Sequence, residues 1–466
     1  MTSASARGRR YLGVAVGFVL TTAAIAACSK SSADAPTGVK CTPGNYVFCR
    51  CEDRSEGTKL CRPDGVSFDD CKCDGTGGPI TEDPDAGFEA GPLEEIDSGG
   101  PTTGPTIDAK CINKLGLIAG GGADVTPPAD KDVYLALYSA VGTFKVSEAV
   151  AGLGIRGPAT ILPVGTNLIA TYLGRYGYMG WSKMTPGGSP PWSSPDSLGD
   201  GTADTSKPTS MTLIGGQLRV FYYGQDDHYH MGTYAAATGW DNALTAAPIA
   251  EASGDAGTPI PGKSAPTTAA VGSSITLAFT GDDGTIARET FSSGSWSAIT
   301  KFSTAPAFPA TPAVVALDGS GTSDELMVYA GQDLLLHVST RAASNKVWSA
   351  AILFDTAASS TELALAQLPG GKAMLVYRTS AKKGFYSVWA PGTGFSTPAE
   401  LVAGKNPDIA SVPSVIRGQC GSDATIAYAQ KDGTVKILKY TGTTMAGPFD
   451  VGGITKASWV GVGELP

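Results

Sequence analysis

Residues 274–296 read SITLAFTGDDGTIARETFSSGSW and contain one complete unit of a pattern that recurs along the chain. An apolar run ends in an aromatic residue, a Gly-containing turn follows, and a second run leads to another turn and a tryptophan. Short apolar runs separated by such turns predict antiparallel strands joined by hairpins.

The aromatic residues that end the apolar runs recur at a regular interval. They are Tyr138, Tyr172, Tyr222, Phe279, Tyr329, Tyr377 and Tyr428. From the second onward the intervals are 50, 57, 50, 48 and 51 residues. Upstream of most of them a proline opens a strand of small residues, at Pro158, Pro208, Pro266, Pro312 and Pro413. A period of about 50 residues with four short strands per unit is typical of a β-propeller.

These runs are apolar at successive positions, as expected for strands covered on both faces by neighbouring sheets. The sequence therefore predicts an all-β fold, with a seven-bladed β-propeller over residues 111–466. The interval of only 34 residues between Tyr138 and Tyr172 leaves six or eight blades as alternatives.

The two ends of this region predict how the ring closes. The first unit lacks a proline-led inner strand, whereas the strand-like run 457–465 at the C-terminus has no blade of its own. We expect the C-terminal strand to complete the first blade, because this removes an exposed sheet edge. Cys111 precedes the first blade and Cys420 lies in the last, so we hypothesise that a disulfide joins them at the same seam.

The first 27 residues have the pattern of an export signal. A basic start precedes the apolar run 11–27, which is shorter than the roughly 20 residues that a membrane span needs. The basic residues are Arg7, Arg9 and Arg10.

The run closes with the sequence IAAC, which ends at Cys28. This motif resembles the lipobox of bacterial lipoproteins. The resemblance implies that the leader is removed, that the Cys28 thiol carries lipid such as palmitate, and that residues 28–40 form a tether to the membrane. Because Ser29 stands where an Asp would retain the protein at the inner membrane, it also implies an outer-membrane location. An ordinary secretory leader cut after Ala27 is the alternative.

Six cysteines occupy residues 41–73, namely Cys41, Cys49, Cys51, Cys61, Cys71 and Cys73. So short a segment buries too little apolar area to fold without cross-links, and an exported protein meets oxidising conditions. We predict a disulfide-rich module with its pairing left open. A metal cluster is the alternative, which the lack of histidine in the segment disfavours.

Residues 74–108 contain nine acidic residues and no Lys or Arg, among many Gly, Pro and Thr residues. Such a segment repels itself and buries little, so we predict a disordered linker over 74–110. The formal charge of the whole chain is −9, which argues against a nucleic-acid partner because phosphate binding depends on clustered Lys and Arg. We expect a monomer.

Candidate ligand-binding residues gather in one unit, in the stretch LRVFYYGQDDHYHMGTY at 218–234. They are Arg219, Tyr223, Asp226, Asp227, His228 and His230. The two histidines share one face of a predicted strand, so a metal site is conceivable. The sequence favours a polar hairpin tip instead, because other units have GDDG and QKDG at this position. We therefore assign no metal and no cofactor.

The same stretch resembles the repeat units of fucose-binding propeller lectins. In that family an Arg at the start of the aromatic strand and a Glu twelve residues later hold the sugar. Arg219 matches the Arg, but Met231 occupies the Glu position. The resemblance therefore implies a shared architecture rather than a shared sugar pocket. Sialidase-like propellers are a weaker match, because residues 292–296 have the Trp of their repeated box without its Asp.

These observations favour a binding, recognition or scaffold module in the cell envelope, with a glycan or an envelope protein as partner. No catalytic residue is assigned; a carbohydrate-active enzyme is the alternative and requires a deep channel holding two acids with His228 or His337. Glycan binding would be favoured by a group of exposed aromatic residues, namely Tyr176, Tyr178, Trp181, Tyr223 and Tyr229.

Substitution of the lipidation residue tests the anchor. We expect Cys28→Ser to leave an unlipidated precursor that fractionates as a soluble protein, because each acyl methylene contributes about 0.8 kcal/mol of membrane binding. Recovery of the variant in the membrane fraction would contradict lipid anchoring.

Overall fold

The computed structural model divides into two compact units, residues 1–87 and 88–466. The residues that it describes are 46–50, 56–60, 62, 64, 67–70, 94–97, 106–121, 133–149, 157, 159–173, 179–194, 196–198, 207–240, 249, 263–281, 283–302, 311–319, 321–331, 333, 335–355 and 362–466. In the first unit, β1 (Tyr46–Arg50) pairs antiparallel with β2 (Glu56–Leu60). Cys49 lies on β1; Cys28 and the other five cysteines of the predicted module lie outside the described residues.

The second unit is all-β, and its described residues form seven antiparallel sheets around one axis. The innermost strands, in ring order, are β33 (Trp459–Glu464), β7 (Thr160–Val164), β11 (Ser210–Ile214), β15 (Thr267–Val271), β20 (Ala313–Ala316), β24 (Glu362–Leu368) and β29 (Ser414–Arg417). Each contacts the next, and β29 contacts β33, so the ring is closed. The predicted seven-bladed propeller is confirmed.

The remaining strands lie progressively farther from the axis in each blade. The second strands are β4 (Leu115–Gly120), β8 (Asn167–Leu173), β12 (Gln217–Tyr223), β16 (Ser274–Thr280), β21 (Ser323–Ala330), β25 (Lys372–Arg378) and β30 (Ala424–Ala429). The third strands are β5 (Val133–Ala140), β9 (Met179–Met184), β13 (Tyr229–Ala235), β17 (Ile286–Ser292), β22 (Leu336–Ala342), β26 (Gly384–Ala390) and β31 (Val435–Tyr440).

The outer strands are shorter and more varied. They are β6 (Thr143–Ala149), β10 (Asp196–Leu198), β14 (Gly239–Trp240), β18 (Ser295–Trp296) with β19 (Thr300–Lys301), β23 (Ile352–Asp355), β27 (Gly394–Phe395) with β28 (Ala399–Glu400), and β32 (Met445–Val451). The first blade has a fifth strand, β3 (Glu94–Asp97), which pairs with β6. Four residues of the segment for which composition predicts a linker therefore form a strand.

The apolar core consists of layers between neighbouring blades rather than one central cluster. Each of the seven blade-to-blade interfaces has its own cluster of buried residues. The aromatic residues that reveal the period occupy equivalent places: on the second strand, nearly fully buried, and packed toward the preceding blade. These are Tyr172, Tyr222, Phe279, Tyr329, Tyr377 and Tyr428.

Tyr138 departs from this pattern, and its position explains the short interval of 34 residues. It lies on β5, the third strand of the first blade, where its hydroxyl donates to the Ile107 carbonyl at 2.8 Å. The second strand of that blade is β4, which contains no aromatic residue and is therefore not marked by the aromatic period. Ile118 of β4 stands 51 residues before Ile169 of β8, so the period holds once the correct strand is used.

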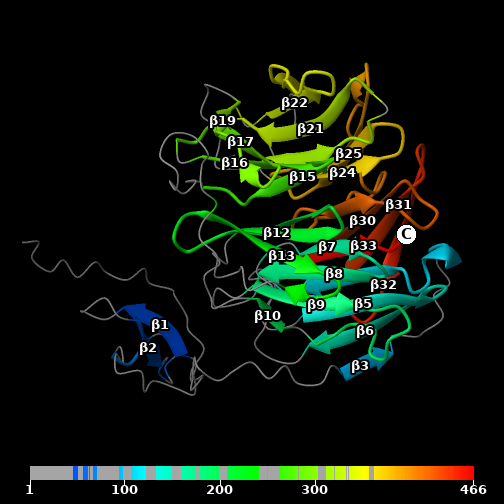
Figure 1. The fold of residues 1–466 in the computed structure, drawn as a ribbon. Coiled ribbons are helices and arrows are strands. Elements are labelled where there is room, and N and C mark those ends of the chain that lie inside the picture. Colours follow the sequence, from blue (N-terminus) through cyan, green and yellow to red (C-terminus); the bar gives the residue numbers. More distant parts are fainter. Residues whose placement is uncertain are drawn as a thin grey trace, which may run out of the picture. The chain divides into compact units, whose positions relative to one another are not determined.

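The C-terminal strand completes the first blade, as predicted. All six residues of β33 pair antiparallel with β4, from Trp459 opposite Gly120 to Glu464 opposite Leu115. Figure 1 shows β33, in red, beside β7 of the second blade. A Cβ atom added at Gly461 would approach the Ala159 carbonyl oxygen to 2.4 Å, so glycine allows β33 to pack closely on the next blade.

Two further interactions join the first and last blades at this seam. The predicted disulfide between Cys111 and Cys420 is present, and it links residues 309 positions apart. Beside it, Lys439 of β31 forms a buried ion pair with Glu464. The other carboxylate oxygen of Glu464 accepts hydrogen bonds from the backbone N–H groups of Gln419, at 2.7 Å, and Cys420, at 3.2 Å. Burial lowers the pKa of Lys439, and the Glu464 charge opposes this effect.

Removal of one partner of the buried ion pair tests the seam. We expect Glu464→Gln to lower the free energy of unfolding by about 3–5 kcal/mol, because it removes the charged partner that contacts the buried Lys439 ammonium. Asp450→Asn is the matched control. Asp450 is exposed and pairs with Lys436, which lies on β31 as Lys439 does. Loss of this exposed pair should cost less than about 1 kcal/mol. Equal effects of the two substitutions in chemical denaturation would contradict a structural role for the buried pair.

Candidate functional site

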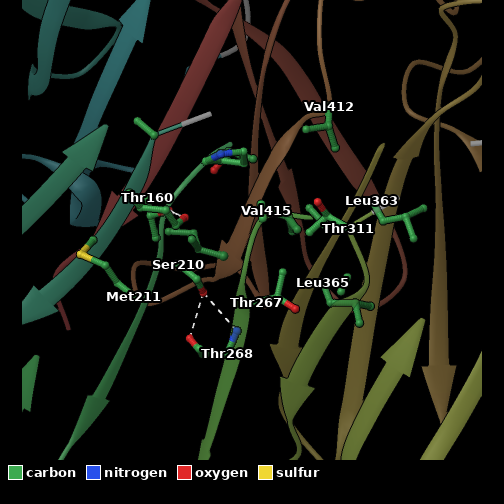
Figure 2. A pocket seen from close by; sticks show the side chains of 18 of the residues that line it. Thr160, Ser210, Met211, Thr267, Thr268, Thr311, Leu363, Leu365, Val412 and Val415 are labelled. Atoms are coloured by element: carbon green, nitrogen blue, oxygen red, sulfur yellow. Dashed lines mark hydrogen bonds between the residues drawn. The ribbon is translucent and has the colours of Figure 1, made fainter. Parts of the chain in front are cut away.

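A cavity lies on the axis of the ring and is the candidate binding site. Its volume is about 410 Å³, and residues from all seven innermost strands line it. Figure 2 shows labelled side chains from several blades, such as Thr160, Thr268, Thr311, Leu363 and Val415, surrounding this space. The proline-led strands, which the sequence places innermost, therefore form the cavity wall. Pro208, Pro266 and Pro413 are themselves part of it.

Hydroxyl groups of the wall mostly bond neighbouring strands to one another. Thr160 donates to the Thr209 carbonyl at 3.0 Å, and Thr267 donates to the Pro312 carbonyl at 2.8 Å. Ser210 and Thr268 share a hydrogen bond of 2.9 Å, drawn in Figure 2. These bonds cross from one blade to the next, so the hydroxyl groups help to hold the ring together.

Among the described residues, the side chains that line the cavity are apolar or carry a hydroxyl group, apart from the indole of Trp459. Neither His228 nor His337 lines it, and no carboxylate does. A general acid or base for hydrolysis must reach its substrate within hydrogen-bond distance. Within the described part of the wall, the cavity therefore has the composition of a binding site rather than that of a catalytic channel.

The polar cluster in the third blade forms a hairpin tip between β12 and β13. The His230 Nε2 atom lies 3.0 Å from the Asp226 Oδ1 atom, and the His230 ring stacks on Tyr222 with 5.0 Å between centroids. The fifth blade repeats the arrangement with His337, Asp333 and Tyr329. A pairing that recurs at equivalent hairpins indicates a structural cap.

The electrostatics of the tip agree with this interpretation. Burial raises the pKa of Asp226, but the hydrogen bond and charge of His230 outweigh it and hold that pKa below its usual range. Asp227 has φ 64° at the turn, and its carboxylate accepts a hydrogen bond from Tyr223 at 3.2 Å. Among the described residues, no group of three His, Cys, Asp or Glu side chains could hold a metal ion.

Arg219 lies near the start of β12, the second strand of the third blade. Its guanidinium donates to the Thr233 hydroxyl and, at 3.1 Å, to the Gln217 side chain. Met231, which replaces the Glu of the fucose-lectin motif, pairs with Phe221 on the neighbouring strand. Arg219 thus makes contacts within its own blade, and the acidic partner of the sugar motif is missing.

Of the aromatic residues proposed for glycan stacking, the three that the structure describes do not form an exposed platform. Tyr223 and Tyr229 are buried between the third and fourth blades, and the Tyr229 hydroxyl donates to the Ser264 carbonyl at 2.9 Å. Trp181 packs against Trp240, with 6.0 Å between ring centroids. Tyr176 and Tyr178 lie outside the described residues.

A buried charged cluster at the interface of the fourth and fifth blades was not foreseen from the sequence. Arg341 donates to Asp324 at 2.8 Å and lies 3.1 Å from Glu325, which also accepts a hydrogen bond from Thr276 at 2.7 Å. Burial raises the pKa of Glu325 to about 7, although the charge of Arg341 acts in the opposite direction. The charge of Arg288 also acts to lower the pKa of Glu325.

A second hollow, of about 270 Å³, lies between the fifth and sixth blades. Its walls include Trp389, Pro391, Thr340 and the exposed side chain of Ile352. Within the described wall this hollow also has no titratable residue, and it involves two blades only. The axial cavity, in which all seven blades take part, remains the principal candidate site.

No protein-family model matches the chain, and no curated protein matches it. Solved structures do match. The BP39L lectin from Burkholderia pseudomallei has a TM-score of 0.51 and 15% identity, and the match covers 73% of this chain and 99% of that chain. A fucose-specific lectin from Aleuria aurantia has a TM-score of 0.46 and 14% identity, with coverages of 64% and 94%. The match to BP39L shows a shared propeller fold.

The titration of Glu325 predicts a pH dependence of stability. Because its pKa is raised in the folded protein, the native state binds this proton more tightly than the unfolded chain does. The contribution of Glu325 to stability is therefore greatest below its ordinary pKa of 4.5 and is lost as the pH rises through about 7. We compare the free energies of unfolding of the unsubstituted protein and of Glu325→Gln. We expect the difference between them to fall by up to about 3 kcal/mol from pH 4.5 to 8. A difference that is constant with pH would contradict the raised pKa.

Proposed function

We propose that this protein is a lipid-anchored recognition module of the bacterial cell envelope, and that its propeller binds ligand in the axial cavity. The observation that carries the proposal is the composition of that cavity, whose described wall offers apolar and hydroxyl groups. Its volume is within the range of about 300–1,000 Å³ that small-molecule sites occupy.

The anchor is proposed from the N-terminal sequence. The IAAC motif supports lipid attachment at Cys28, with the outer membrane as the location. Among the described residues, no helix is long and apolar enough to cross a membrane. The tether and the cysteine-rich segment would then display the propeller away from the lipid surface.

Glycan recognition is the second candidate function. The BP39L protein, whose fold this propeller shares, is named a lectin. Arg219 is the one residue of the fucose-lectin motif that the chain retains at that unit, and its Glu position is Met231. A glycan would therefore have to be held by groups other than this Arg–Glu pair. An envelope protein remains a further partner, and an enzyme is disfavoured by the composition of the cavity wall.

A ligand screen tests the proposed function. The unlipidated Cys28→Ser chain is mixed with neutral glycans and small molecules, and its melting temperature is measured. We expect at least one compound class to raise the melting temperature of this chain, because a ligand that binds only the folded state stabilises it. The shift should disappear in a chain that also carries Thr311→Trp, which fills the cavity. Ligands that bind equally well to that variant, or that are turned over, would contradict recognition in the cavity.

A further inference from the structure

The closing strand supplies part of the cavity wall. Trp459 and Val462 of β33 both line the cavity, and the Trp459 side chain is only half-buried. Other parts of the wall come from other blades and include Leu363 and Leu365 of β24. A ligand in this space would touch the strand that closes the ring as well as several blades in the middle of the chain.

Most hydroxyls of the wall already form a hydrogen bond within the ring. Thr160, Ser210 and Thr267 already bond to neighbouring blades, and Ser414 accepts a hydrogen bond from the Val462 N–H at 3.3 Å. Thr311 differs, because its hydroxyl makes no side-chain hydrogen bond within the described part of the chain. Within the described wall, Thr311 therefore has the one hydroxyl that neither donates nor accepts a side-chain hydrogen bond, while the Ser414 O–H and the Trp459 indole N–H are further donors among predominantly apolar surfaces.

Charge would be strongly disfavoured in such a space. A buried ion without a counter-charge loses its hydration and gains no equivalent interaction. The described lining contains no Lys, Arg, His, Asp or Glu that could compensate either sign of charge. A polyhydroxylated ligand meets a similar difficulty, because each buried hydroxyl without a partner costs about 1–3 kcal/mol.

We propose that the axial cavity binds a small, uncharged, predominantly apolar molecule through a single hydrogen bond to Thr311. This inference rests on the proposed recognition function and specifies its ligand class. Contact with Trp459 places the ligand against β33, so binding also favours the closed ring. The apolar body of the ligand is held by the side chains of Leu363, Leu365 and Val415.

Two fluorescent probes on the same scaffold test the ligand class. N-phenyl-1-naphthylamine is uncharged and has one N–H group, whereas 1-anilinonaphthalene-8-sulfonate adds a sulfonate. We expect the neutral probe to bind the unlipidated chain at least about tenfold more tightly, a difference of about 1.4 kcal/mol. Tryptophan excitation should sensitise the bound probe, and Trp459→Phe should reduce that energy transfer, because Trp459 lines the cavity.

Substitutions at Thr311 locate the bound probe. Thr311→Trp should reduce its affinity at least about tenfold by occupying the cavity, whereas Thr311→Val, which keeps the volume but removes the hydroxyl, should reduce it about three- to tenfold. Thr397→Trp is the matched control, because Thr397 is an exposed loop residue outside the cavity lining and its substitution should change nothing.

Three results would overturn the inference. They are no binding of the neutral probe, equal binding of the anionic probe, and affinity that is insensitive to both Thr311 substitutions. If neutral glycans rather than the apolar probe bind in a way that depends on Thr311, the ligand class is wrong while the recognition function stands. If neither the neutral probe nor any compound of the ligand screen binds with an affinity that depends on Thr311, both proposals fail.

Discussion

The antiparallel pairing of β33 with β4 is the contact on which the rest of the propeller depends. Each blade buries both of its faces against neighbours, so an open ring would leave the apolar faces of the first and last blades in water. The interface between those two blades contains as substantial an apolar cluster as the others, and it forms only when residues from the two ends of the propeller meet. The disulfide between Cys111 and Cys420 restricts the unfolded chain across the same seam.

Among the described residues, buried ion pairs lie at two of the blade-to-blade interfaces. At the seam, Thr425 of β30 donates to Glu464, and between the fourth and fifth blades Thr276 of β16 donates to Glu325. The two threonines occupy equivalent positions in their blades, each directed at the following blade. Each carboxylate is then met by a basic residue, Lys439 or Arg341. Such pairs contribute little net stability over apolar packing, but the loss of one partner is costly. They therefore favour one particular arrangement of neighbouring blades.

The geometry that closes the ring also shapes the candidate site. Seven inner strands converge on the axis, and their side-chain hydroxyls bond across the blade boundaries. The wall that remains is largely apolar, and the closing strand is part of it through Trp459 and Val462. Ring stability and ligand recognition consequently depend on the same few strands. The histidine–aspartate pairs lie at hairpin tips, and they contribute to the turns rather than to the cavity.

The sequence by itself determined the all-β class, the repeat near 50 residues, the seven blades, the C-terminal closure and the Cys111–Cys420 pair, because periodic burial and an unmatched terminal strand are visible as patterns. It misplaced Tyr138, since an apolar run ending in an aromatic residue fits a third strand as well as a second. Only the tertiary structure decided that Lys439 meets Glu464, that Glu325 meets Arg341, and that Thr311 faces the axial cavity. Lys439 and Glu464 come from different blades, and Glu325 and Arg341 come from neighbouring strands of one blade. Their distances depend on strand register and on how the sheets pack around the axis, which no local pattern in the chain encodes.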